Sequence, residues 1–336
     1  MANQKGQHRI TLLSKLTFAP EARSAEGNPP IIEGRFRYFW DTFKRNNNYL
    51  MLANLFLLIF FLPLIVALVL PNVFGGMEGL SYFLKKTTKL PYYMSNIGIG
   101  ISQGQDVLAG RLAILEAYHF YLLICACALP FTSFGLAGMF HIAIKFIWQD
   151  SFIYKKDSYG NHVPRIVKEF FIGVKNNWLQ YLIVMTAFAL IFAGVASSFV
   201  FFIRQYWQGL AGGGEWVLII FASIIALFPI LLLIYMLPMI PMYKLPLISK
   251  FKNSFLLIIT MLVPSLFIAA ISAVPFLLSA LLGGFLKVII IALILVFGGG
   301  FYSVMWCNFV QFHAEKIITP VYEANKNKGK KKKKNK

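Results

Sequence analysis

The stretch FWDTFKRNNNYLMLANLFLLIFFLPLIVALVL, residues 39–70, decides the fold of this chain. It opens with an aromatic, basic and amide signature at Phe43, Lys44 and Asn46, and residues 49–70 then contain no charged side chain. About 20 apolar residues suffice for a helix to cross the hydrocarbon core of a bilayer. The stretch therefore predicts a transmembrane helix whose entrance is cationic and aromatic, the composition typical of a membrane interface.

The same signature recurs twice along the chain, each time directly before another apolar run. The second copy is Lys175, Asn176 and Asn177 before residues 178–203, and the third is Phe251, Lys252 and Asn253 before residues 255–282. Each copy opens a pair of apolar spans. We therefore expect three helical hairpins that are related as pseudo-repeats.

Composition supports a membrane protein. The 336 residues are 58% apolar and only 13% charged, against roughly 25% charged residues in a soluble domain. The fold class that follows is an all-α polytopic membrane protein with six transmembrane helices. The expected spans are residues 49–70, 112–147, 178–203, 216–243, 255–282 and 285–312.

The distribution of cations predicts the orientation and the division of the chain. Lysine and arginine gather before the first span, in residues 148–177 and 244–254, and after residue 312. The positive-inside rule then places both termini in the cytoplasm. The expected location is the cell membrane, which the chain crosses several times. We expect a disordered cytoplasmic leader over 1–34, a membrane domain over 35–312 and a lysine-rich cytoplasmic tail over 313–336.

The second span is too long for one straight helix. Residues 112–147 would extend about 54 Å as a helix, whereas the hydrocarbon core is about 30 Å thick. Pro130 and Gly135 lie inside this run, and proline removes a backbone hydrogen bond from a helix. We therefore expect a long second helix that is broken near Pro130, with residues 71–118 forming an outer projection.

The outer projection is the expected docking element for a partner membrane protein. It carries Tyr82, Phe83, Tyr92 and Tyr93 among lysines and glycines, and aromatic side chains are enriched in protein interfaces. The alternative is an unpartnered loop whose aromatic rings rest on lipid headgroups.

Candidate catalytic chemistry is sparse. Glu116 and His119 are three residues apart and share one helical face, which fits either a proton or cation relay or an outer polar patch that also includes Arg111. His141 and Lys145, near the inner end of the second span, fit interfacial side chains better than a ligand site. The sequence contains no phosphate-binding loop, zinc-ligand spacing or nucleophile elbow, so we expect neither an enzyme, a cofactor nor a metal site.

Two further features concern packing and partners. The glycines at 298–300 in the last span favour close helix packing over a break that lines a substrate path. The lysine-rich tail suits anionic lipid first and the ribosome, through its RNA backbone, second; DNA is not an expected partner.

Several of these motifs together resemble the YesL-like family of bacterial integral membrane proteins. The matching text is residues 39–46, Asn54-Leu55, Leu62-Pro63, Leu129-Pro130 with the Thr132, Gly135 and Ala137 that follow, and residues 170–177. The Leu-Pro pair occurs twice here, with an extra outer segment over about 64–128 between the copies. The resemblance implies a link to carbohydrate uptake or polysaccharide use.

Three functions fit these expectations. The first is a non-enzymatic accessory or scaffold protein of the cytoplasmic membrane, associated with carbohydrate uptake or cell-envelope assembly. The second is a transporter with a path along broken helices. The third is a ribosome-linked factor of membrane-protein biogenesis. A polar cavity at mid-membrane would favour the transporter, and a groove open to both lipid and cytoplasm the biogenesis factor.

Overall fold

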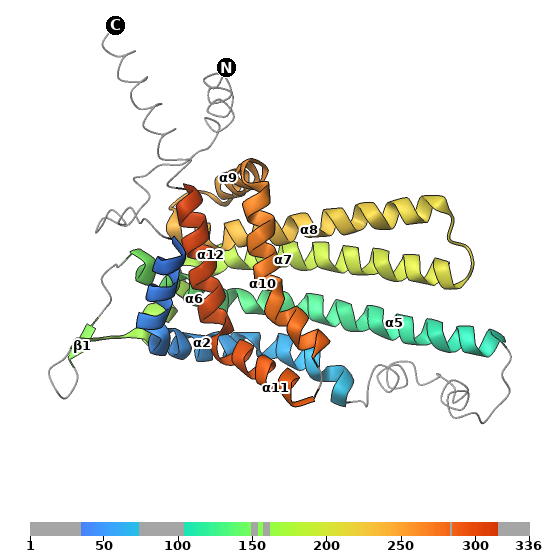
Figure 1. The fold of residues 1–336 in the computed structure, drawn as a ribbon, viewed down its shortest axis with the longest axis horizontal. Coiled ribbons are helices and arrows are strands. Elements are labelled where there is room, and N and C mark those ends of the chain that lie inside the picture. The colour runs from blue at the N-terminus through green and yellow to red at the C-terminus, as the bar shows by residue number, and fades with distance from the viewer. Residues whose placement is uncertain (1–34, 74–103, 149–153, 157–161, 283, 315–336) are drawn as a thin grey trace, which may run out of the picture. The chain divides into compact units, whose positions relative to one another are not determined.

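The computed structural model describes residues 35–73, 104–148, 154–156, 162–282 and 284–314, and these residues are almost entirely helical (Figure 1). The long helices in chain order are α2 (Arg35–Val73), α5 (Gly104–Ala128), α6 (Thr132–Trp148), α7 (Ile166–Trp207) and α8 (Gly213–Met242). They are followed by α9 (Leu247–Thr260), α10 (Leu262–Leu281), α11 (Gly284–Leu293) and α12 (Gly299–His313). Between α6 and α7, strands β1 (Tyr154–Lys156) and β2 (His162–Pro164) form an antiparallel pair.

Six segments are long and apolar enough to cross a membrane, so the predicted fold class is confirmed. They are Phe36–Pro71, Arg111–Trp148, Ile166–Trp207, Gly213–Met242, Leu262–Ser279 and Phe285–His313. The first and third begin about a dozen residues before the expected spans, because the polar signature residues there are already helical. The fifth begins later than expected, because residues 247–260 form the separate helix α9.

The second span is interrupted where the sequence predicts. A 3₁₀ turn, Leu129–Phe131, separates α5 from α6, and Pro130 lies in its centre. Proline cannot donate the backbone hydrogen bond that an α-helix requires, so the bonding pattern changes there. The flanking Ala128 and Thr132 keep right-handed helical dihedral angles, so the turn does not reverse the chain. The prediction of Gly135 as a break residue was wrong, because Gly135 lies inside α6.

The chain divides into two compact units. One comprises Met1–Ile59, Phe134–Tyr181 and Ile230–Lys336, and the other comprises Phe60–Ser133 and Leu182–Pro229. Helices α2, α6, α7 and α8 each contribute residues to both units.

Each unit has its own buried contacts. The largest fully buried side chains of the first unit include Tyr181, Tyr235, Phe140 and Phe170. In the second unit, small residues of α2 and α5 pack together: Ala67, Cys125 and Ala128 are buried, with Leu64, Tyr121 and Ile124 packed against them.

Several predicted features lie outside the described residues. They are the leader 1–34, the four aromatic residues Tyr82, Phe83, Tyr92 and Tyr93 of the outer projection, and the tail from residue 315 onward. Of the projection, residues 104–118 belong to α5.

Candidate functional site

Helices α6 and α7 approach each other closely because each has a glycine at the contact. A Cβ atom added at Gly138 would lie 2.7 Å from the ring of Phe170, and one at Gly173 would lie 2.5 Å from the Cβ of His141. Both distances are shorter than any tolerated contact. Small residues are the usual means of bringing two membrane helices together, and here they also bring the polar side chains of the two helices within bonding range.

A buried carboxylate lies at this contact, and two basic side chains converge on it. Oε2 of Glu169 is 3.0 Å from Nζ of Lys145 and 3.4 Å from Nε2 of His141. The Glu169 side chain is 1% exposed, whereas those of Lys145 and His141 are 20% and 18% exposed. Burying a carboxylate is costly unless it is paired and hydrogen-bonded, and this one is. We name these three residues the carboxylate centre.

The backbone of both helices also favours these charges. Glu169 is in the first turn of α7, and Lys145 is in the last turn of α6. An acid near a helix N-terminus and a base near a C-terminus are each stabilised by the helix dipole. The carboxylate centre therefore joins the end of α6 to the start of α7. The sequence indicated His141 and Lys145 as interfacial side chains and did not single out Glu169.

A second buried charge joins three helices of the first unit. Nζ of Lys250, on α9, donates hydrogen bonds to Oε1 of Gln180 on α7 at 2.6 Å and to the carbonyl of Ile240 on α8 at 2.9 Å. Ile240 lies in the last turn of α8, where carbonyls have no partner within the helix. Lys250 is only 2% exposed, and this burial lowers its pKa to about 8. The sequence placed Lys250 only among the cations of residues 244–254.

Asn54 performs a similar role on α2. Its Nδ2 donates to the carbonyls of Leu295 and, at 2.9 Å, of Val296, inside the π-helical segment Ile294–Gly298. A π segment disturbs the regular bonding of a helix, so its carbonyls are open to a donor from another helix. A Cβ at Gly299 would lie 2.1 Å from Oδ1 of Asn54. The predicted packing role of the 298–300 glycines is therefore confirmed at Gly299.

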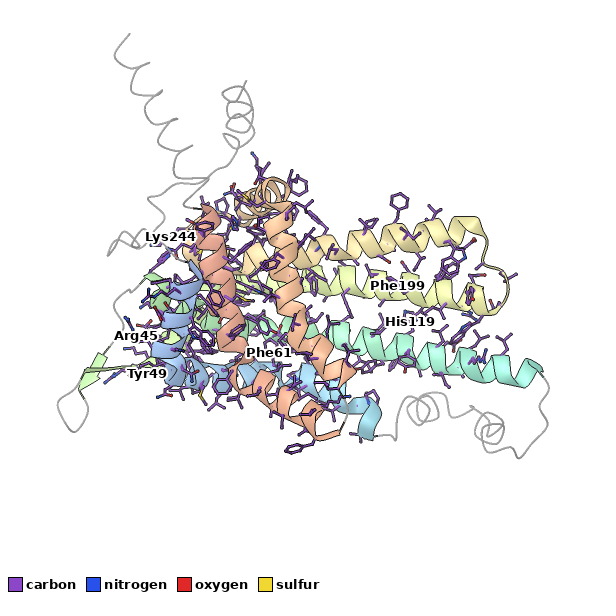
Figure 2. All side chains as sticks on the ribbon, in the orientation of Figure 1. Arg45, Tyr49, Phe61, His119, Phe199 and Lys244 are labelled. Atoms are coloured by element: carbon purple, nitrogen blue, oxygen red, sulfur yellow. The ribbon has the colours of Figure 1, made fainter. Side chains whose placement is uncertain are left out.

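The predicted pair Glu116 and His119 makes two contacts with α7 in the second unit. Oε1 of Glu116 is 4.0 Å from Nη2 of Arg204, and Nε2 of His119 is 2.8 Å from Oγ of Ser197 (His119 is labelled in Figure 2). Ser197 donates its own proton to the carbonyl of Ala193 at 2.8 Å, so its oxygen accepts from the imidazole. Both contacts join α5 to α7.

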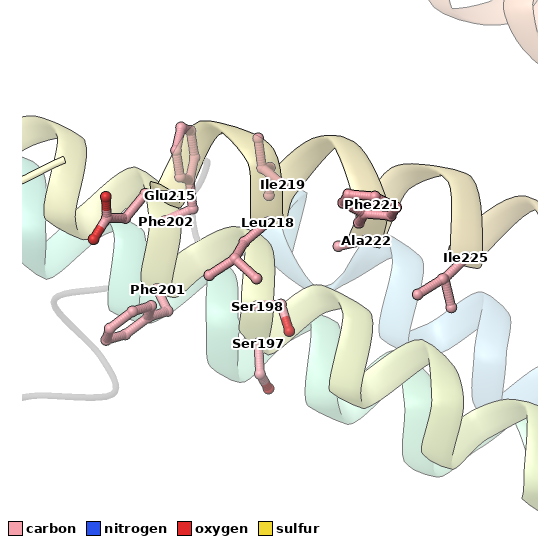
Figure 3. A pocket seen from close by; sticks show the side chains of 10 residues that line it. All are labelled: Ser197, Ser198, Phe201, Phe202, Glu215, Leu218, Ile219, Phe221, Ala222 and Ile225. Atoms are coloured by element: carbon pink, nitrogen blue, oxygen red, sulfur yellow. The ribbon is translucent and has the colours of Figure 1, made fainter. Parts of the chain in front are cut away.

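An open groove of about 530 Å³ lies between α7 and α8 in the second unit (Figure 3). Its polar groups already have partners: Ser198 donates to the carbonyl of Gly194 at 2.9 Å, and Glu215 accepts from the backbone of Gly212 at 2.8 Å. The remaining surface is mostly apolar, so the groove suits hydrocarbon rather than a polar substrate. The lining residues are Ser197, Ser198, Phe201, Phe202, Glu215, Leu218, Ile219, Phe221, Ala222 and Ile225.

The three signature copies occupy different helices. Phe43, Lys44 and Asn46 lie on α2, Lys175, Asn176 and Asn177 on α7, and Phe251, Lys252 and Asn253 on α9.

In the first two copies the asparagine side chain bonds the backbone of its own helix. Asn46 and Asn177 each donate to the carbonyl four residues earlier, at 2.9 and 3.2 Å, whereas Asn253 is fully buried on α9. The lysine of each copy, at 44, 175 and 252, is exposed. The first two copies continue into long spans, and the third does not. The pseudo-repeat stays a prediction.

Metal ligation and homology give no further guide. Within the described parts of the chain, no three His, Cys, Asp or Glu side chains are grouped so that they could hold a metal ion. Comparison of the chain with protein-family models, with curated proteins and with solved structures found no match.

Proposed function

We propose that this protein is a non-enzymatic accessory or scaffold protein of the cytoplasmic membrane. One observation carries the proposal: three buried polar side chains, Glu169, Lys250 and Asn54, each hold helices together. Glu169 joins α6 to α7, Lys250 joins α9 to α7 and α8, and Asn54 joins α2 to the π segment before α12. A catalytic or transport site instead needs polar groups that face a substrate.

The outward surface supports the same role. Large apolar side chains on α7, α8, α10 and α11 are exposed in the isolated chain, among them Leu190 at 70%, Leu218 at 69% and Phe267 at 68%. In a bilayer this surface meets lipid or the helices of other membrane proteins. The association with carbohydrate uptake or envelope assembly rests on the resemblance to YesL-like proteins. Lipid and ribosome binding by the tail belongs to the same proposal.

The transporter is the second candidate, and the interrupted spans favour it. The 3₁₀ turn at Leu129–Phe131 and the π segment at Ile294–Gly298 are irregular backbone within candidate spans, which is where some transporters bind substrate. Against this, the amide of Asn54 already engages two carbonyls of the π segment.

The test compares partner capture with transport. The tagged full chain is crosslinked in native membranes and purified in lipid nanodiscs, and co-purifying proteins are quantified against an unrelated six-span protein expressed at the same level. A scaffold protein is expected to co-purify with the subunits of one membrane protein complex in near-stoichiometric amounts. The proposal is overturned if no such set is found, or if the purified chain alone carries a labelled sugar or ion saturably into liposomes.

A further inference from the structure

Helix α9 is too short to span a membrane, yet it is joined at both ends to candidate spans. Its 14 residues extend about 21 Å, against a hydrocarbon core of about 30 Å. The preceding candidate span ends at Met242 and the following one begins at Leu262 (Figure 1). Helix α9 therefore links the end of one candidate span to the start of the next.

Helix α9 buries polar side chains on one face and exposes apolar side chains on the other, which is the reverse of a surface helix in a soluble protein. The inward face contains three buried polar residues, Lys250, Asn253 and Ser254, beside Leu256 and Leu257. Lys250 is fixed there by Gln180 and by the carbonyl of Ile240. This inward anchoring determines which face of α9 is presented outward.

The outward face is an apolar stripe with one cation. Ile248 is 82% exposed, Phe251 47%, Phe255 40% and Ile259 54%, and the exposed Lys252 lies among them. At 3.6 residues per turn, these five positions fall within an arc of about 100°. We name them the α9 outer face. Helices that lie in the plane of a membrane interface combine an apolar stripe with lysine or arginine side chains.

The positive charge on and beside α9 favours anionic lipid. Helix α9 contains no acidic residue, and the exposed Lys244 precedes it by three positions (Figure 2). Each cation near a membrane surface adds about 1 kcal/mol of attraction to anionic lipid. We propose that α9 is an in-plane interfacial helix whose outer face binds anionic phospholipid. This lipid-binding surface does not depend on the scaffold role.

The first test measures the depth of α9 in the bilayer. The full chain, with Cys125, Cys127 and Cys307 replaced by alanine and its folding verified, receives a bimane label at Ile248→Cys or Ile259→Cys. Depth is read in proteoliposomes from quenching by lipids brominated at different acyl positions. The labels are eleven residues apart, about 16 Å along a helix. An in-plane helix gives nearly equal, shallow depths.

A matched control comes from α10, which is a candidate span. Val263 and Val274 are also eleven residues apart and are 77% and 46% exposed. Labels there are expected to differ in depth by most of 16 Å. The proposal fails if the α9 pair differs as much as the α10 pair. It also fails if aqueous iodide, rather than brominated lipid, quenches the α9 labels, since the outer face then meets water or protein.

The second test measures lipid selectivity. In vesicles of equal parts phosphatidylcholine and phosphatidylglycerol, the Ile248→Cys label is quenched by brominating one lipid or the other. We expect phosphatidylglycerol to quench more, and Lys252→Gln to lower its local enrichment up to about fivefold. Lys252→Arg keeps the charge and keeps the enrichment. Equal quenching by both lipids in the unaltered chain overturns the anionic-lipid assignment.

Discussion

Within the carboxylate centre, Lys145→Met is expected to destabilise the protein more than Glu169→Gln. Lys145→Met removes the ammonium group 3.0 Å from the carboxylate of Glu169, which is 1% exposed, while His141 stays at 3.4 Å. A buried charge that loses its partner costs about 3–5 kcal/mol. Glu169→Gln leaves instead an ammonium group that is 20% exposed and can extend to water or headgroups. Its expected cost is that of a lost charged hydrogen bond, about 1.5–3 kcal/mol.

The measurement is thermal unfolding of the purified chain in nanodiscs at neutral pH. With a shift of about 2 °C per kcal/mol in a chain of this size, Lys145→Met lowers the Tm by roughly 6–10 °C and Glu169→Gln by roughly half as much. The double variant Lys145→Met/Glu169→Gln is more stable than Lys145→Met alone, because the buried charge that lost its lysine is gone. Equal losses for the two single variants, or additive losses in the double, would refute a pairing of Lys145 with a buried carboxylate.

Three other variants test separate contacts by the same assay. Gly299→Ala places a methyl group 2.1 Å from Asn54 and should lower the Tm by several degrees, whereas Gly298→Ala meets nothing closer than 3.4 Å and should cost much less; similar losses would contradict the α2 contact. Burial lowers the pKa of Lys250 to about 8, so the unfolded chain binds more protons than the folded chain between pH 8 and 10.5, and the fold gains stability as the pH rises there. The Tm of the unaltered chain relative to Lys250→Met should therefore rise by a few degrees from pH 7.5 to 9.5. A fall would contradict the assignment of a lowered pKa to Lys250. Glu116→Gln removes a half-exposed ion pair and should shift the Tm by less than about 2 °C; a large loss would indicate a buried role.

The spans could be predicted because hydropathy is a local property. An uncharged apolar run specifies a membrane helix wherever its neighbours lie. The starts of α2 and α7 could not be predicted this way, because residues 35–48 and 166–177 include charged and amide side chains yet are helical. Helical backbone satisfies its own hydrogen bonds, so a helix can continue past the apolar run without an apolar environment.

Helix α9 was missed because its polar residues face inward. In the sequence, Lys250, Asn253 and Ser254 read as a polar entrance to a span that begins at residue 255. In the structure they are buried, and the chain turns at Met261, where φ is −126° and ψ is 40°. Which side of an amphipathic helix is covered depends on the helices around it, and those contacts are not contained in local sequence.

The carboxylate centre was missed for a related reason. His141 and Lys145 are four residues apart, so their shared face was visible in the sequence. Their partner Glu169 lies on the next helix, beyond the β1–β2 pair, and resembled an ordinary loop acid. The glycines that allow this approach, Gly138 and Gly173, gave the available signal: one glycine on each of two consecutive helical segments, near basic residues on one and an acid on the other.

Several buried polar side chains of this chain bond backbone carbonyls of other helices and do not face a ligand site. Pro241 has no N–H, so the carbonyl of Leu237 lacks its helical donor, and the hydroxyl of Tyr181 donates to it at 2.7 Å. Lys250 and Asn54 likewise bond carbonyls left open by a helix end and by a π segment. In an apolar environment an open carbonyl costs several kcal/mol, and a donor from a neighbouring helix is one way to satisfy it. At Pro241, the end of α8 and the π segment, a buried donor and an open carbonyl are thus two parts of one arrangement, and a buried polar side chain here is first to be tested as the partner of a backbone carbonyl on another helix.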